Sequence, residues 1–122
     1  MLPGRDLPQE QSMSIEFQGK SIATDDEGFL LAREDWSKDL MHFMAQKDGL
    51  TLTDEHIFII QTVRRYYEEY ATTPAMRSLI ALIKKEGHTE LASSLKLARL
   101  FPKGAAKTAA RYAGLPKPVK CI

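Results

Sequence analysis

The chain has 122 residues, of which 43% are hydrophobic and 27% charged, and its formal net charge is +1. This size and composition are typical of one soluble globular domain, and no apolar run approaches the roughly 20 residues that a membrane-spanning helix needs. The single cysteine excludes an internal disulfide, and it also excludes a zinc site built on several thiolates.

The N-terminal segment changes character after residue 13. Residues 1–13 are polar and interrupted by prolines and a glycine, which predicts a disordered leader. This leader lacks the basic and apolar regions of a signal peptide, so we expect a cytoplasmic protein. Ile15 and Phe17 then alternate with polar residues before a possible turn at Gln18-Gly19, which predicts a β-hairpin. After an acidic turn, residues 29–31 are predicted to form a third short strand.

Five helices are predicted after the strands, at about residues 37–47, 53–70, 74–86, 93–100 and 105–113. Their expected N-caps are Asp35 or Ser37, Thr53, Thr73 followed by Pro74 at the first helical position, and Thr89 or Ser93. In the fourth helix the expected buried stripe is Leu91, Leu95, Ala98 and Leu100. The predicted fold class is α+β, with a hairpin followed by a helical bundle in one domain over residues 14–114. Two of the helices, within residues 53–87, form a helix-turn-helix-like pair.

The end of the chain is basic. Residues 91–122 hold 7 of the 17 lysines and arginines and none of the 16 acidic side chains. Such a tail is either a solvated face or a surface for an anionic partner such as nucleic acid. Within it, residues 115–122 contain two prolines and no helical pattern, which predicts a flexible C-terminal arm.

Cys121 is the only thiol, and it is the penultimate residue of this arm. The positive charges of Lys117 and Lys120 favour its thiolate, so both a reactive role and an incidental exposed thiol are open. The three histidines have no metal-ligand spacing, and nucleophile-elbow and phosphate-loop motifs are absent. We therefore expect no metal, no cofactor and no self-contained active site.

Several motifs resemble the DsrC/TusE family. The resemblance is carried by Phe101-Pro102-Lys103-Gly104, by residues 113–118 with the penultimate Cys121, and by residues 73–77 and Asp35-Trp36. It covers about residues 14–122 and implies a small α+β fold with a mobile arm. Members with two cysteines carry the second one in the last helix before the arm, where this chain has Arg111 and no cysteine. The chain is therefore similar to the single-cysteine, TusE-like branch.

The resemblance implies a sulfur carrier. Cys121 would accept persulfide sulfur from a TusBCD-like complex and pass it to an MnmA-like tRNA 2-thiouridylase for wobble-uridine thiolation. In this scheme the protein is a sulfurtransferase component that acts only with partner proteins, and direct contact with the tRNA is left open. The basic side chains of the arm and its surroundings, which could aid docking, are Lys103, Arg111, Lys117 and Lys120.

Three other hypotheses remain at the level of sequence. A single-cysteine DsrC-like protein could serve sulfur oxidation or dissimilatory sulfite metabolism, with dissimilatory sulfite reductase as a partner. A DNA-binding regulator could instead use the helix-turn-helix-like pair and the basic tail. A purely structural subunit of a larger reductase would form a stable complex that does not depend on the thiol. The oligomeric state has no signal in the sequence.

Overall fold

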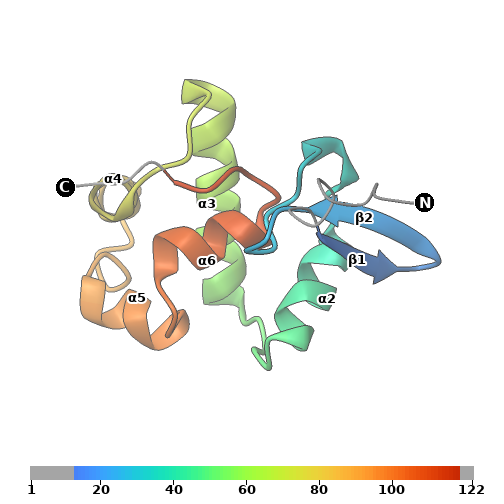
Figure 1. Ribbon diagram of the computed structural model, residues 1–122. Coiled ribbons are helices and arrows are strands. Elements are labelled where there is room, and N and C mark those ends of the chain that lie inside the picture. The colour runs from blue at the N-terminus through green and yellow to red at the C-terminus, as the bar shows by residue number, and fades with distance from the viewer. Residues whose placement is uncertain (1–12, 119–122) are drawn as a thin grey trace, which may run out of the picture.

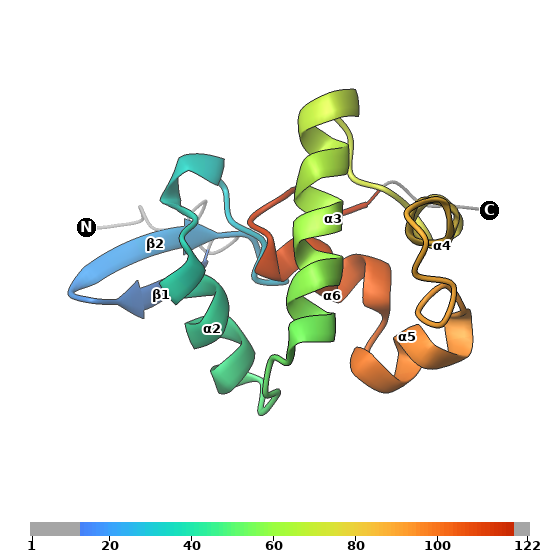
Figure 2. The same ribbon diagram turned by 180° about the vertical axis from the view of Figure 1, so that it is seen from behind.

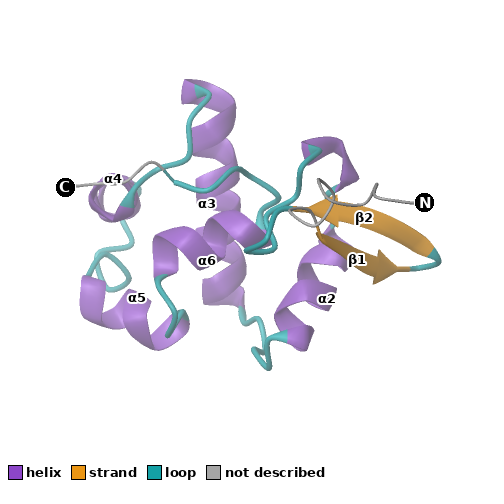
Figure 3. Cartoon of the chain, viewed as in Figure 1, coloured by secondary structure: helices purple, strands orange, loops and turns teal. Residues whose placement is uncertain are grey.

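The computed structural model describes residues 13–118. The elements follow in the order β1 (Met13–Phe17), β2 (Lys20–Thr24), a 3-10 turn η1 (Arg33–Asp35), α2 (Lys38–Lys47), α3 (Asp54–Tyr70), α4 (Met76–Lys85), α5 (Ser94–Leu100) and α6 (Ala105–Tyr112). The two strands lie at one end of the molecule and the helices make up the rest (Figures 1 and 3). The predicted α+β class, a hairpin followed by helices, is confirmed.

The hairpin is a two-stranded antiparallel sheet in which Phe17 pairs with Lys20. Its two-residue turn places both Gln18 and Gly19 at positive φ, 51° and 78°, as a tight hairpin turn of this kind requires. Ile22 is buried. The predicted third strand at residues 29–31 is reduced to one bridge between Thr24 and Leu30, with a backbone hydrogen bond on either side of it.

Three of the predicted helix starts are confirmed. Ser37 and Ser93 each accept a hydrogen bond from the backbone amide three residues on, and Thr53 forms a capping box with His56. The prediction for Thr73 as an N-cap is wrong. Helix α4 begins only at Met76, after Ala75, and it has no side-chain cap.

Helices α3 and α6 form the centre of the bundle, and they cross each other in both Figure 1 and Figure 2. Helix α6 contributes buried alanines, among them Ala109 and Ala110, whose small side chains let its backbone approach α3 closely. The aliphatic side chains of Ile59, Ile60 and Val63 on α3 complete this contact and are fully buried.

The predicted buried stripe of α5 is partly wrong. Leu91 and Leu100 are buried as expected, whereas Leu95 is 66% exposed and Ala98 is also exposed. Leu97 takes the inward position instead and, with Leu100 three residues later, forms the buried face of α5.

Candidate functional site

The structure separates the predicted site residues. Cys121 and Lys120 lie outside the described residues, so their predicted roles stay predictions. Lys103 and Arg111 line a cavity beside α6. Lys117 lies elsewhere, in the segment that leads to Cys121, and it is exposed. The geometry that bears on Cys121 is therefore that of residues 115–118, here called the arm base.

The arm base begins inside the core. Leu115 is 2% exposed, and its amide donates a 3.0 Å hydrogen bond to the carbonyl of Ala110 on α6. Gly114, at φ +73°, makes the reversal that brings Leu115 back against the bundle. A Cβ atom at Gly114 would lie 2.7 Å from Cδ1 of Trp36, so both the backbone angle and the lack of space require glycine.

Two side chains bind the carbonyl groups that α6 leaves free at its end. The indole nitrogen of Trp36 donates a 2.7 Å hydrogen bond to the carbonyl of Tyr112, and Arg64 donates a 2.8 Å bond to that of Ala113. The guanidinium of Arg64 also stacks 3.7 Å from the centre of the Trp36 ring. Its partial burial lowers the pKa of Arg64. Together these contacts orient the turn from which the arm base leaves α6.

Thr73 holds the next residue of the arm base. Its side chain is 4% exposed, and its hydroxyl donates a 2.9 Å hydrogen bond to the carbonyl of Pro116. The threonine that the sequence indicated as a helix cap therefore binds a segment 43 residues away. The sequence did not indicate Thr73 as a site residue, because a threonine before a helix has the same local sequence whether its hydroxyl caps the helix or binds a distant carbonyl.

A third contact is ionic. Glu27, in the turn after the hairpin, pairs with Lys117 at 2.8 Å and with Lys107 at 3.0 Å. The hydrogen bonds from Lys117 and then Lys107 lower the pKa of the Glu27 carboxyl. The same pair raises the pKa of Lys117. This contact joins the arm base to the loop that follows the hairpin.

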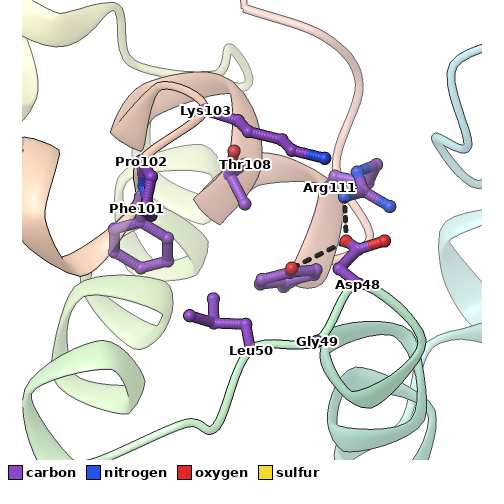
Figure 4. A pocket seen from close by; sticks show the side chains of 9 residues that line it. Asp48, Gly49, Leu50, Phe101, Pro102, Lys103, Thr108 and Arg111 are labelled. Atoms are coloured by element: carbon purple, nitrogen blue, oxygen red, sulfur yellow. Dashed lines mark hydrogen bonds and ion pairs between the residues drawn. The ribbon is translucent and has the colours of Figure 1, made fainter.

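The cavity beside α6 has a volume of about 140 Å³ and is drawn in Figure 4. Asp48, at the end of α2, accepts hydrogen bonds there from Arg111 and, at 2.7 Å, from the hydroxyl of Tyr112. Burial opposes ionisation of Asp48, yet these two bonds hold the pKa of its carboxyl below the ordinary value. Burial, followed by the bond to Asp48, raises the pKa of Tyr112. Lys103 lies at the rim, so the walls carry both signs of charge.

The basic tail is largely paired within the molecule. Four of its cations have acidic partners from earlier in the chain: Lys96 with Glu55, Lys107 and Lys117 with Glu27, and Arg111 with Asp48. These side chains are less available to an anionic partner than the sequence indicated, which weakens the DNA-binding hypothesis.

No group of three or more metal-ligating side chains occurs within residues 13–118. Across the same residues, no helix has the length and hydropathy to cross a bilayer. His56 is structural, since its Nδ1 accepts from the amide of Thr53 and its Nε2 is 2.7 Å from the carbonyl of Leu100.

The chain is similar to several known proteins over most of its length. Proteins named Sulfurtransferase TusE are 45% identical over 88% of the chain in Yersinia pestis and over 87% in Escherichia coli (strain K12), covering 99% and 97% of those proteins. The NMR structure of Allochromatium vinosum DsrC superimposes with a TM-score of 0.81 at 45% identity, over 91% of this chain and 99% of that one.

A second solved structure is more distant. The crystal structure of the oxidized gamma-subunit of the dissimilatory sulfite reductase (DsrC) from Archaeoglobus fulgidus superimposes with a TM-score of 0.77 at 35% identity, over 90% of this chain and all of that one. The family model described as "DsrC like protein" matches residues 16–122, a range that includes the arm base and Cys121. By this match and by the identities above, the chain belongs to the DsrC family.

Proposed function

We propose that this protein is a sulfur carrier of a persulfide relay and that Cys121 is the residue that carries the sulfur. The observation that carries the proposal is the family match through residue 122, together with relatives named Sulfurtransferase TusE over nearly their whole length. The chain has one cysteine, so a carrier cycle must run on Cys121 alone. It is a sulfurtransferase component, and its partners supply the other reacting groups.

The transfer step needs little from the carrier. The Cys121 thiolate attacks the outer, sulfane sulfur of a donor persulfide, and a new sulfur–sulfur bond forms on Sγ. The donor's own sulfur–sulfur bond breaks, and its electron pair leaves on the donor thiolate. No net oxidation occurs, because one persulfide and one thiolate are exchanged for another such pair. The second transfer repeats this step with Cys121 as the donor.

The partners follow from the TusE-like relatives. We infer that a TusBCD-like complex supplies the sulfur and that an MnmA-like tRNA 2-thiouridylase accepts it, in the cytoplasm, for modification of the wobble uridine. Lys103 and Lys120 supply positive charge for docking, and Arg111 and Lys117 contribute less because Asp48 and Glu27 already pair with them. This charge suits an acidic protein surface or the tRNA bound to the acceptor.

Intact mass spectrometry tests the carrier role directly. After incubation with a cysteine desulfurase, cysteine and the relay complex, the wild type should gain one sulfur, roughly 32 Da, which a reductant removes. Cys121→Ser should gain nothing, because it has no other thiol, and its melting temperature should match that of the wild type. Lack of sulfur on the wild type while the relay complex is itself loaded would refute the proposal.

A second candidate function is supported by one observation. Allochromatium vinosum DsrC has the same 45% identity as the TusE relatives, and this similarity supports a single-cysteine DsrC-like role in sulfur oxidation or sulfite metabolism as the second candidate. The two functions differ in the acceptor. Sulfur moving from loaded Cys121 to an MnmA-like enzyme and into tRNA favours the first, whereas stable binding to dissimilatory sulfite reductase without tRNA thiolation favours the second.

A further inference from the structure

Thr73 is a buried polar side chain that the carrier chemistry does not use. It lies in the linker between α3 and α4, and both Thr73 and the following Pro74 are buried. A threonine hydroxyl here could have served α4, yet the helix begins three residues later without a side-chain cap. The hydroxyl instead bonds the Pro116 carbonyl at 2.9 Å.

This hydrogen bond comes at a point where the chain has few other constraints. Leu115 is fixed in the core, whereas Pro116 and Lys117 are exposed. Proline has no amide hydrogen, so Pro116 and Pro118 cannot be held by donating backbone bonds. The Pro116 carbonyl is therefore the backbone group through which the arm base can be fixed, and the buried Thr73 side chain donates a hydrogen bond to it. The other contact, between Lys117 and Glu27, is exposed and screened by water.

The place where the arm leaves the body limits where Cys121 can act. The arm base runs past α3 toward α4 in both Figure 1 and Figure 2. Cys121 comes three positions after Pro118, and three residues of extended chain span at most about 10 Å. A partner's reacting sulfur must therefore come close to the place where Pro118 leaves the body.

We propose that Thr73 is a positioning residue for sulfur transfer, because its bond to Pro116 fixes the direction in which the arm leaves the body. The inference rests on the carrier function proposed above. Without this hydrogen bond the thiol should react as before with a small reagent. The range of positions open to Cys121 should widen, however, so that fewer of them suit a docked partner. The expected signature is a weaker apparent affinity for the protein partner with unchanged small-molecule reactivity.

The experiment compares Thr73→Val, which keeps the shape and loses the hydroxyl, with Thr73→Ser, which keeps the hydroxyl. Thr62→Val is the matched control, since Thr62 is also fully buried and donates a 2.8 Å bond to a carbonyl, that of Phe58 within α3. Spin labels on Cys121 and on Gln46→Cys, an exposed position of α2, report the distance distribution between the arm and the body. The unlabelled wild type and the three threonine variants, each with Cys121 as the only cysteine, are assayed for sulfur transfer from the loaded relay complex and for alkylation by iodoacetamide.

We expect the distance distribution to broaden in Thr73→Val and to stay as in the wild type in Thr73→Ser and Thr62→Val. The kcat/KM for sulfur transfer should fall about fivefold in Thr73→Val, mainly through KM, as expected for the loss of one hydrogen bond. Its alkylation rate should be unchanged. An unchanged distribution in Thr73→Val overturns the proposal, and so does a broadened one with normal transfer. Failure of the wild type to take up sulfur overturns the carrier function instead. The distance distributions still test whether Thr73 orients the arm.

Discussion

The hairpin and the arm base are both peripheral segments without helices, and the molecule attaches them in opposite ways. The hairpin has regular backbone pairing at five positions, but much of its surface is exposed. It packs against the rest of the fold through the buried Ile22 and through the contact between Phe17 and Phe43. The arm base has no regular structure. It is nevertheless held by a core residue, Leu115, and by the tertiary bonds of Thr73 and Glu27.

The difference shows that regular secondary structure and integration into a fold are separate properties. A backbone ladder satisfies the polar groups of the hairpin locally, so few distant side chains are needed there. The prolines of the arm base interrupt such a ladder, and the Pro116 carbonyl accepts its hydrogen bond from the distant Thr73. Thr73 and Glu27, the two side chains that bind the arm base, come from segments far apart in sequence, so its position depends on the whole domain.

The largest expected effect comes from adding a methyl group at the turn before the arm base. Gly114→Ala should lower the free energy of unfolding by about 2–4 kcal/mol, because it combines a positive φ with a clash against Trp36. Gly19→Ala in the hairpin turn is the matched control. It has a similar φ of 78° but no atom within 4 Å, so only about 1 kcal/mol should be lost.

Urea unfolding followed by circular dichroism measures both variants. Equal losses for the two glycines would contradict the close packing of Trp36 against Gly114. A larger loss at Gly19 would reverse the comparison between the hairpin and the arm base.

An intermediate effect is expected from two adjacent arginines on α3. Arg64 bonds the Ala113 carbonyl and stacks on Trp36, so Arg64→Met should cost about 1–2 kcal/mol of unfolding free energy. Arg65 pairs with Glu86 and is 56% exposed, so Arg65→Met should cost less than about 1 kcal/mol. Chemical denaturation at two salt concentrations separates them, since only the Arg65 contribution should shrink in salt. Similar losses with similar salt dependence would show that Arg64 is not anchored as described.

The smallest effect concerns the ion pair that joins the two regions. Because Lys117 and Lys107 lower the pKa of Glu27 below the ordinary 4.5, its contribution to stability is present above pH 4.5 and is lost as the pH falls through the lowered value. Lys117→Met should raise the Glu27 pKa toward 4.5, and Lys20→Met in the hairpin should not. An NMR titration of the Glu27 carboxyl carbon measures this. A wild-type Glu27 that titrates at its ordinary value would contradict the pair.

Much of the fold could be predicted from local signals. The caps Ser37, Thr53 and Ser93 and the glycines after the helices mark boundaries through chemistry within a few residues, and these boundaries are confirmed. The family could be identified because its motifs are contiguous. The carrier role of Cys121 is a prediction from that resemblance, and the described part of the structure adds the anchoring of the segment that precedes it.

The tertiary contacts could not be predicted in this way. Thr73 has the local sequence of a helix cap, and only the packing of α6 against α3 brings Pro116 within its reach. The basic tail looked uncompensated because Glu27 and Asp48, which neutralise three of its cations, lie 63 or more positions earlier in the chain. Leu95 and Leu97 have the same hydropathy, and the packing of α5 against the rest of the fold decides which of them is exposed.

The burial of Leu115 has a consequence for proteolysis of the protein in the cell. Proteases bind substrates as extended strands, and the segment from Gly114 to Pro118 cannot extend unless Leu115 leaves the core. Clipping at this segment is therefore limited to molecules in which Leu115 has left the core. Molecules with Leu115 in place are protected there, so bodies clipped at this segment do not accumulate and compete for the same partners.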